Sequence, residues 1–445
     1  MFALENAMSR ALLSVVLLLV LGASEARAQF GDLAELIPDV FSETVILREA
    51  GHQAHFVDAT TGLREAGLQI NRSFARQLST FPVGSSSGGF TFEFNEELGI
   101  FERSTSTFGS VFAERGETIG KGKWNFGVSA FALDYDAIDD LGFNNGDLEF
   151  SLTHLDTNFD GTTIETFFEG DLILVETALS LETQTTVFFG SYGISQRFDL
   201  AIAVPLIEVD LSARLARHIS RLASEGRDEV PLHLFPDGAD QQIVEASGSE
   251  SGVGDVLVRA KYNFARNADG ALAAAIDVRL PTGDEKNLLG SGATQSKVFL
   301  IGSSNFGRFS PHVNLGYTFS SGSSDLLGGE LSDEINFTAG ASVSANPRVT
   351  FFGDLVWRTL LDATKLQRRE LTHLYRRFDS TEVQSTTRPT IEGVEDDLNL
   401  ILGSVGVKVN FVRELLVSLN LGFSLGEDGL RDEDVWPMLS VDYSF

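Results

Sequence analysis

The chain contains no cysteine, only 10 prolines and 3 tryptophans, and far fewer basic than acidic side chains. The missing cysteines exclude disulfides, zinc-thiolate sites and cysteine nucleophiles. With 33 Lys and Arg against 63 Asp and Glu, the net charge is −30, which excludes nucleic acid as a partner because its phosphate backbone attracts cations. No segment after residue 28 approaches the run of about 18 apolar residues that a membrane helix needs. What is abundant is glycine, with 43 residues, and phenylalanine, with 35, a composition that favours a β protein.

The first 28 residues are predicted to be a secretory signal peptide that is cleaved after Ala28. Arg10 precedes an apolar run over residues 11–22, and the small-residue site Ala26-Arg27-Ala28 follows it. The segment contains two charges of each sign, so the exported chain keeps the acidity of the whole. An exported chain without disulfides needs a large core or a closed sheet for its stability.

From residue 124 onward, segments of about ten residues alternate apolar and polar side chains, the pattern of membrane-spanning strands. The connections between these segments alternate between short turns and long loops. Outer-membrane barrels have short periplasmic turns and long external loops, whereas a soluble sandwich has no reason to segregate its loops in this way. We predict twelve strands, at residues 124–135, 176–194, 198–211, 252–264, 271–280, 294–305, 309–320, 333–345, 348–361, 397–411, 414–425 and 435–445.

The two faces of the predicted strands differ in polarity. Along residues 252–264, for example, Val256, Val258 and Ala260 alternate with Asp255, Arg259 and Lys261. A lipid-facing apolar band around a charged lumen fits a membrane barrel, since a soluble barrel turns its apolar face inward. An interfacial girdle is predicted from the aromatic residues that flank the short turns: Tyr192, Phe198, Phe264, Phe306, Phe309 and Phe411. The sequence therefore predicts an all-β membrane protein of the bacterial outer membrane, an antiparallel transmembrane β-barrel of about 12 strands over residues 124–445.

The two ends of the exported chain carry different signals. The alternating segment that ends in Phe445 resembles the signal by which the barrel-assembly machinery recognises its substrates. Residues 29–123 are predicted to form a separate N-terminal region with helical segments at 33–47 and 63–78 and a hairpin at 90–103. Three arrangements remain open: a plug in the lumen, a periplasmic domain, or extra strands that enlarge the barrel to fourteen.

Two short motifs resemble a catalytic and a metal-binding motif but lack the neighbouring elements or ligands that such sites need. Residues 84–88 match the G-x-S-x-G pattern without the strand and helix that a nucleophile elbow requires, which favours a loop. His52 and His55 stand three residues apart with no third ligand at a supporting spacing. No Ser, His and Asp residues lie at a spacing that suits a barrel hydrolase, so we expect neither an enzyme nor a resident cofactor.

A third motif gives the sharpest metal hypothesis. Asp156, Asn158 and Asp160, followed by Gly161, reproduce the first half of a calcium-binding loop. The second half is absent, because Phe167 stands where a bidentate Glu belongs. The motif therefore predicts either a calcium site or a turn rich in Asp and Asn side chains that bond their own backbone.

A set of strand residues supplies candidates for the lumen. A turn centred near residue 268 places Arg259 opposite Asp277, with Arg279 near Asp255 and Lys261. The resulting mixed-sign wall is predicted either to form a polar path for a substrate or to pair internally and rigidify the barrel. Its members are Asp255, Arg259, Lys261, Asp277, Arg279, Asp354, Arg358 and Lys408.

Four stretches, at residues 252–264, 277–285, 288–295 and 309–317, resemble the outer-membrane barrel family named for the meta-pathway of phenol degradation. The second stretch contains Leu280-Pro281-Thr282-Gly283-Asp284, its most specific feature. Residues 81–90 and the plug-sized N-terminal region are more weakly similar to the long-chain fatty-acid transporters of the outer membrane. Those transporters begin with Asn-Pro-Ala, whereas residues 29–31 here are Gln-Phe-Gly. The resemblance implies transport of hydrophobic or aromatic compounds.

Two functions from different classes are therefore expected. The first is passive uptake of a small, hydrophobic or aromatic compound through a gated lumen. The second is a structural or surface-interaction barrel whose acidic loops bind divalent cations or lipopolysaccharide. Both imply outer-membrane lipids as partners, and only the first implies a small-molecule substrate.

Overall fold

The computed structural model describes residues 32–445, apart from residues 43–44, 49–55, 57–58, 79–81, 83, 87–88, 96–99, 104, 158, 160, 163, 165, 229–230, 268, 322, 325–328 and 413. The predicted signal peptide and the two histidines His52 and His55 lie outside the described residues.

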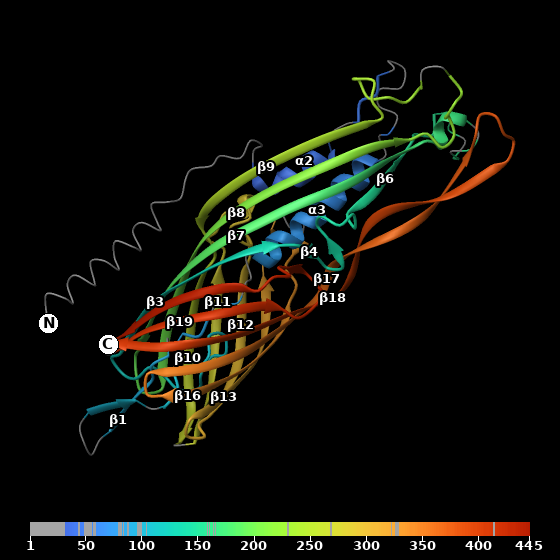
Figure 1. Ribbon diagram of the computed structural model, residues 1–445. Coiled ribbons are helices and arrows are strands. Elements are labelled where there is room, and N and C mark those ends of the chain that lie inside the picture. Colours follow the sequence, from blue (N-terminus) through green and yellow to red (C-terminus); the bar gives the residue numbers. More distant parts are fainter. Residues whose placement is uncertain are drawn as a thin grey trace.

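Twelve of the described strands form a closed antiparallel barrel (Figure 1), as predicted. Each predicted segment overlaps one of them. The ring runs β7-β3-β21-β19-β18-β17-β16-β13-β12-β11-β10-β8 and closes through the pairing of β8 with β7. The strands are β3 (Trp124–Tyr135), β7 (Leu172–Gly193), β8 (Phe198–Ser220), β10 (Val256–Asn267), β11 (Gly270–Leu280), β12 (Thr294–Ser304), β13 (Phe309–Ser321), β16 (Glu334–Asn346), β17 (Val349–Arg376), β18 (Val383–Val412), β19 (Leu415–Ser424) and β21 (Trp436–Ser444).

Several strands extend well beyond their predicted ends. β7 and β8 pair over their whole lengths, β17 and β18 form a hairpin that reaches Arg376 and Val383, and a further strand, β9 (Gln241–Val253), pairs with the outer half of β8. Figure 1 shows these parts projecting from the end of the barrel opposite the C label. Part of the predicted long loops is therefore strand. Along the outer hairpin of β17 and β18 both faces of the strands contact water, so the apolar alternation that identifies a lipid-facing strand is lost although the backbone still pairs.

The outer surface of the barrel carries apolar side chains that are exposed among the described residues. Examples are Leu300, Leu315 and Phe351. At the end with the short turns, Trp124 stacks on Phe126, with ring centroids 5.7 Å apart. Exposed members of the predicted girdle are Phe264, Phe306, Phe309 and Phe411. A lipid-facing apolar band with an aromatic belt is the surface of a membrane-spanning barrel.

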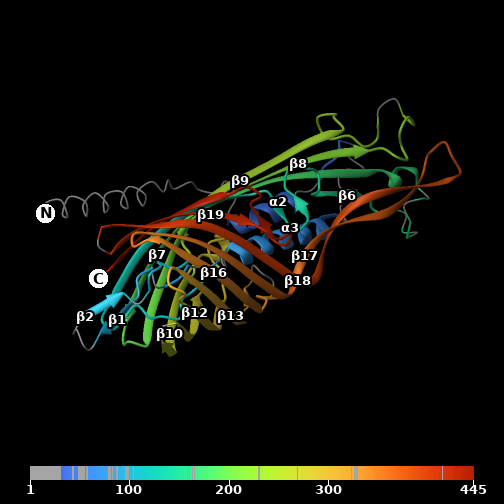
Figure 2. The ribbon, with the colours of Figure 1, turned by 60° about the horizontal axis from the view of Figure 1, so that its bottom comes forward.

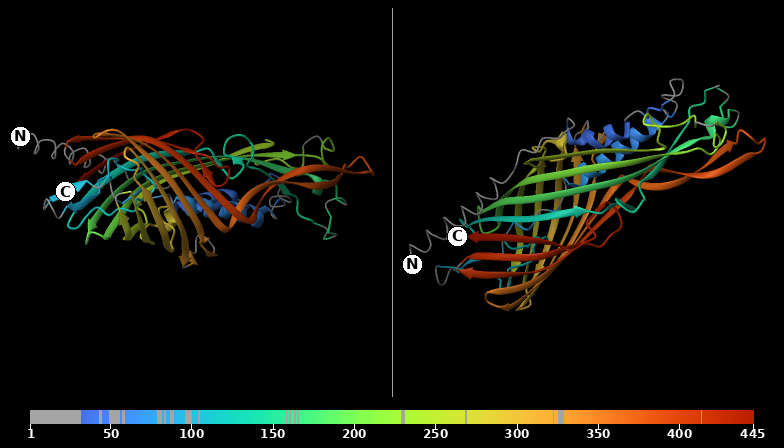
Figure 3. Two further views of the ribbon diagram at one scale, coloured as in Figure 1. Left: turned by 90° about the horizontal axis from the view of Figure 1, so that it is seen from below. Right: turned by 45° about the horizontal axis from the view of Figure 1, so that its top comes forward.

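No helix among the described residues is long and apolar enough to cross a membrane. The helices η1 (Leu33–Glu35), α2 (Leu36–Ser42) and α3 (Ala59–Leu78) instead lie on the concave side of β7, β8 and β9, as Figure 3 shows. Gly67 lets α2 and α3 approach closely, because a Cβ there would lie 3.2 Å from Phe41 Cδ2. Apolar side chains of both helices share one core with the inner faces of β7 and β8. The lumen is therefore apolar on this side, and the prediction of a polar inner face holds only for the remaining wall.

The predicted hairpin forms as β1 (Phe92–Asn95) and β2 (Ile100–Arg103), a separate two-stranded sheet. It lies near the C label, at the barrel end that carries the short turns (Figure 2). The fourteen-stranded alternative is therefore wrong, since neither strand pairs with the barrel. The remaining short elements are β4 (Ala137–Ile138), β5 (Leu141–Gly142), β6 (Glu149–Thr153), η2 (Phe167–Gly170), η3 (Glu285–Asn287), β14 (Ser323–Ser324), β15 (Gly329–Glu330) and β20 (Leu430–Arg431).

Candidate functional site: the occluded lumen

Residues 105–123, called here the plug segment, run through the lumen between β2 and β3. They have no regular secondary structure, so their backbone groups need partners from elsewhere. Side chains from β8, β10, β12, β13, β17 and β18 supply these partners. The bonding residues are Asp199, Lys261, Asn263, Ser303, Asn314, Thr350, Asp354 and Lys408. The wall of the barrel thus holds the plug segment in one position.

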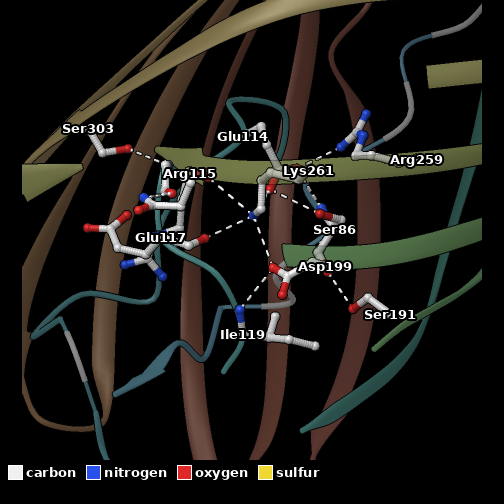
Figure 4. A network of polar contacts seen from close by, with 12 residues as sticks. Ser86, Glu114, Arg115, Glu117, Ile119, Ser191, Asp199, Arg259, Lys261 and Ser303 are labelled. Carbon is white, nitrogen blue, oxygen red and sulfur yellow. Dashed lines mark hydrogen bonds and ion pairs between the residues drawn. The ribbon is translucent and has the colours of Figure 1, made fainter. Parts of the chain in front are cut away.

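Glu114 is the centre of this docking (Figure 4). Its carboxylate accepts hydrogen bonds from Arg259 Nη1 at 2.6 Å and Lys261 Nζ at 2.7 Å. It also accepts from the backbone N and the Oγ of Ser86, at 2.7 and 3.0 Å. Burial alone raises the pKa of Glu114, but the charges of Lys261 and Arg259 outweigh it and lower that pKa to about 2. The buried ion pairs therefore depend on an ionised Glu114.

Lys261 reaches from β10 into the plug segment. Besides Glu114, its Nζ donates to the carbonyl oxygen of Glu117 at 2.9 Å and lies 3.6 Å from an oxygen of Asp199. On the neighbouring strand Lys261 is paired with Ala275, four residues from Arg279. The prediction that Arg279 lies near Lys261 is therefore wrong. The side chain of Lys261 is completely buried, and every one of these contacts is to the plug segment or to β8.

Arg115 stabilises the conformation of the plug segment. Its guanidinium donates to Thr105 Oγ1 at 2.6 Å and to the carbonyl oxygens of Gly89 and Thr107, both at 3.2 Å. Gly109 has φ +69°, and a Cβ there would lie 2.8 Å from Arg115 Cδ. Only glycine fits this turn, both because of its backbone conformation and because the arginine packs against it.

Two further predicted lumen residues also bind the plug segment. Asp354 accepts from the backbone N–H groups of Val111 and Ala113, at 3.0 and 3.2 Å. Lys408 donates to the carbonyl oxygen of Ser110 at 2.9 Å. The lumen charges of Arg259, Lys261, Asp354 and Lys408 thus meet the chain's own plug segment rather than line an open path.

The other predicted lumen residues lie beside or beyond the plug segment. Arg259 bonds Asp277 through two nitrogens, at 2.7 and 2.8 Å, as the predicted register requires. Arg358 pairs with Glu334 at 2.6 Å, and Arg279 lines two cavities of the lumen.

Asp255 has a different role. It accepts from the backbone N–H of Gly283 at 3.0 Å and from Ser291 Oγ at 2.7 Å, and so holds the loop between β11 and β12. The predicted residues therefore do form a set of charges inside the lumen, and Asp255 is the member that supports a loop.

Three cavities surround the N-terminal segments inside the barrel. They enclose about 1110, 730 and 670 Å³ of empty space, part of it open to solvent. Pro82 lines all three, and Phe112 lines the first two. The first cavity is mainly apolar, and its wall includes Phe131, Val187, Phe189, Ile207, Leu257 and Met438. The second is more polar and contains the Arg259–Asp277 and Arg358–Glu334 pairs. The lumen therefore offers an apolar compartment beside a charged one.

Glu114, Asp199 and Glu334 are buried lumen carboxylates that the sequence analysis missed. Arg259 and Lys261 share a strand face on which Arg259 is paired with Asp277 of β11 and Lys261 with Asp199 of β8. The pairing of β10 with β8 would have identified Asp199 as a partner, since a second buried cation requires a second anion. The alternation of the strands does not identify Glu114, which comes from the plug segment.

The structure describes only part of the calcium motif. Asp156 Oδ2 accepts a hydrogen bond from the backbone N–H of Gly161 at 2.7 Å, a contact that a local turn makes. Asn158 and Asp160 lie outside the described residues, so calcium binding stays a prediction. Phe445 pairs with Trp124 through two backbone hydrogen bonds, of 2.9 and 3.0 Å, and its role as an assembly signal stays a prediction as well.

A closed antiparallel barrel with an apolar outer belt and an inner segment bound to its wall defines an outer-membrane β-barrel protein. Residues 161–364, a little under half of the chain, match the family described as "Putative MetA-pathway of phenol degradation", which confirms the resemblance predicted from the sequence. No curated protein matches the chain.

Three solved structures with a similar fold are distant in sequence. An outer membrane channel from Pseudomonas putida F1 is 13% identical with a TM-score of 0.44, and the match covers 74% of this chain and 98% of that one. A Pseudomonas aeruginosa FadL homologue is 11% identical with a TM-score of 0.31, over 73% of this chain and 90% of its own. The toluene transporter TodX of Pseudomonas putida is 10% identical with a TM-score of 0.30, over 73% and 89%.

Proposed function

We propose that this protein is a non-enzymatic outer-membrane channel for the passive uptake of small hydrophobic or aromatic compounds, closed at rest by the plug segment. The observation that carries the proposal is the apolar cavity of the lumen, which directly contacts the plug segment through Val111 and Phe112. A barrel that only anchored or displayed loops would have no need of an apolar compartment in its interior, because apolar cavities bind apolar ligands.

The way in which the plug segment is bound supports a gate. Between residues 105 and 121 its hydrogen bonds and ion pairs to the wall come from individual side chains, and no strand of the barrel pairs with its backbone. Only its last residues, Gly122 and Lys123, share backbone hydrogen bonds with Gly193 at the end of β7. Such hydrogen bonds and ion pairs can break one after another while the strands of the barrel stay paired. The name of the matched family and that of the toluene transporter agree with an aromatic cargo.

The test is the flux of a neutral aromatic solute into vesicles whose outer leaflet is lipopolysaccharide, which such solutes cross slowly without protein. We expect the reconstituted protein to admit the aromatic solute faster than a sugar of similar size. The double variant Glu114→Gln with Asp354→Asn, which weakens plug docking on two sides, should raise both fluxes. Glu245→Gln is the matched control, because Glu245 lies exposed on β9, outside the barrel ring.

Equal impermeability of vesicles with protein, with the double variant and without protein would remove the support for transport. It would favour the alternative of a surface-interaction barrel that binds divalent cations or lipopolysaccharide. One feature fits that alternative. The carboxylate of Asp432 accepts a hydrogen bond from the backbone N–H of Asp134, and that of Asp136 accepts one from the backbone N–H of Glu433. These four acidic residues therefore lie together where β3 ends and the loop after β20 begins. Burial, followed by the neighbouring carboxylates Asp136 and Asp434, raises the pKa of Asp432.

A further inference from the structure

The first cavity has a polar corner on one side of its apolar wall. Asp442, on β21, is only 4% exposed and lines the cavity. Its Oδ1 has no hydrogen-bond partner among the described residues. A buried acceptor without a partner costs free energy, so a native structure needs a reason to keep one.

The barrel wall is shaped to hold Asp442 at this place. Asp442 pairs with Gly127 on β3, and Gly127 pairs with Phe189 on β7. A Cβ at Gly127 would lie 2.2 Å from Phe189 Cζ and 2.8 Å from Asp442 Oδ1. The missing side chain at Gly127 thus lets a carboxyl oxygen and an aromatic ring edge meet at the cavity wall.

The groups near Asp442 leave its oxygen available. Lys408, whose charge acts on Asp442, donates its hydrogen bonds to the carbonyl oxygens of Phe108 and Ser110 instead. Two residues from Asp442 along β21, Ser440 is paired with Ser418, which is in turn paired with Lys408, and all three residues line the same cavity. Ser418 Oγ also lacks a hydrogen-bond partner among the described residues. The corner therefore offers a carboxyl acceptor and a hydroxyl that can accept or donate.

The apolar part of the cavity wall suits a ring. Phe131 and Phe189 come from β3 and β7, Leu257 from β10, and Phe112 from the plug segment, and all four line the cavity. Aromatic side chains favour offset or edge contacts with another ring. A ligand that fills this cavity is therefore apolar over most of its surface and polar at one point.

We propose that this cavity is a binding subsite for apolar, ring-sized molecules that carry one hydroxyl group. The hydroxyl donates to Asp442 Oδ1 and exchanges a second hydrogen bond with Ser418 Oγ, while the ring packs against Phe131 and Phe189. This inference rests on the proposed function and narrows its substrate class from hydrophobic compounds in general to those with a hydrogen-bond donor.

The test compares p-cresol with toluene, which differ by a single hydroxyl group. Their binding to the folded protein is measured by isothermal titration in detergent, with the heats of protein-free micelles subtracted. We expect p-cresol to bind about tenfold more tightly than toluene, the upper end of what one buried hydrogen bond contributes. Asp442→Leu should abolish this preference and leave toluene binding within about twofold.

Two further variants keep the test decisive if Asp442→Leu does not fold. Asp442→Asn keeps a carbonyl acceptor and should retain part of the preference. Ser418→Ala removes only one hydroxyl and should reduce the preference about threefold. Glu245→Leu is the control for loss of a carboxylate outside the lumen and should change neither affinity. Folding of each variant is checked by its electrophoretic mobility before and after heating.

The outcomes separate this inference from the proposed function. If p-cresol and toluene both bind with equal affinity, and the Asp442 and Ser418 variants change neither, the subsite is wrong although a channel for aromatics stands. If neither compound binds and neither crosses the vesicle membrane through the protein, the proposed function fails first. A preference for p-cresol that survives in Ser418→Ala and Asp442→Leu also overturns the assignment, because the hydroxyl then binds elsewhere.

Discussion

Glu114→Gln is the substitution that tests most directly whether buried charge holds the plug segment in the lumen. The variant keeps the size and shape of the side chain and removes its charge. Glutamine retains one acceptor oxygen, but its amide group donates and so opposes one of the two cations, Arg259 and Lys261. Arg259 keeps Asp277 as a partner. Lys261 retains carbonyl oxygens and Asp199 at 3.6 Å.

The expected magnitude follows from the pKa of Glu114. Docking lowers that pKa from 4.5 to about 2, and each pKa unit corresponds to about 1.4 kcal/mol of preference for the ionised form. Neutralising the side chain should therefore cost about 3 kcal/mol of docking free energy. This is at the lower end of the cost of about 3 to 5 kcal/mol for removing one partner of a buried ion pair. The ratio of undocked to docked plug segment should rise about a hundredfold.

The assay is single-channel recording in planar bilayers at neutral pH. We expect brief, rare openings in the native protein and an open probability about a hundred times higher in Glu114→Gln. Glu245→Gln removes the same charge from an exposed pair with Arg214 and should change nothing, since exposed pairs contribute little. An open probability of folded Glu114→Gln within about threefold of that of the control would refute the view that this ion-pair cluster closes the lumen.

Three further outcomes are expected. Acidification to pH 5 should leave the channel closed, because a carboxylate with a lowered pKa stabilises docking above its ordinary pKa of 4.5. Conductance should rise only as the pH falls from that value toward about 2. Gly193→Val should displace the plug segment and raise conductance, since a Cβ there would lie 1.9 Å from the carbonyl oxygen of Gly120. Gly302→Ala, whose nearest neighbour is 3.7 Å away, should not. If residues 156–161 bind calcium, titration should release heat that Asp156→Ala abolishes, whereas identical heats in both proteins would leave only the turn.

The barrel could be predicted because membrane-spanning strands are governed by a local rule. One face contacts lipid and the other does not, so a period of two appears in every segment, and the short turns fix which strands are neighbours. The same rule gave the register of β10 and β11, where Arg259 pairs with Asp277. It failed for the outer parts of β17 and β18, because water on both faces removes the alternation while the backbone pairing continues. The outer part of β8 keeps its alternation, since Leu211, Ala213 and Leu215 are buried in the core that the helices share.

The N-terminal region could not be placed from its sequence. Its helical segments and its hairpin were predicted, but their position inside or beside the barrel depends on contacts with strands far along the chain. Phe41 packs on Phe150 at 5.2 Å, and Glu114 bonds Lys261 across 147 positions. No periodicity encodes such pairs, so a plug, a periplasmic domain and two extra strands looked alike.

The sequence by itself determined the twelve strands, the lipid-facing band and the presence of charges on the inner face. It also predicts the export signal. Each of these follows from the chemistry of a segment in its local solvent. The tertiary structure alone decided what those charges do. Four of the eight predicted lumen residues bind the plug segment. Asp442, whose Oδ1 has no hydrogen-bond partner among the described residues, lies beside an apolar cavity. Closing the barrel brings strands from both ends of the chain around one lumen, and only that closure determines which buried charges find partners.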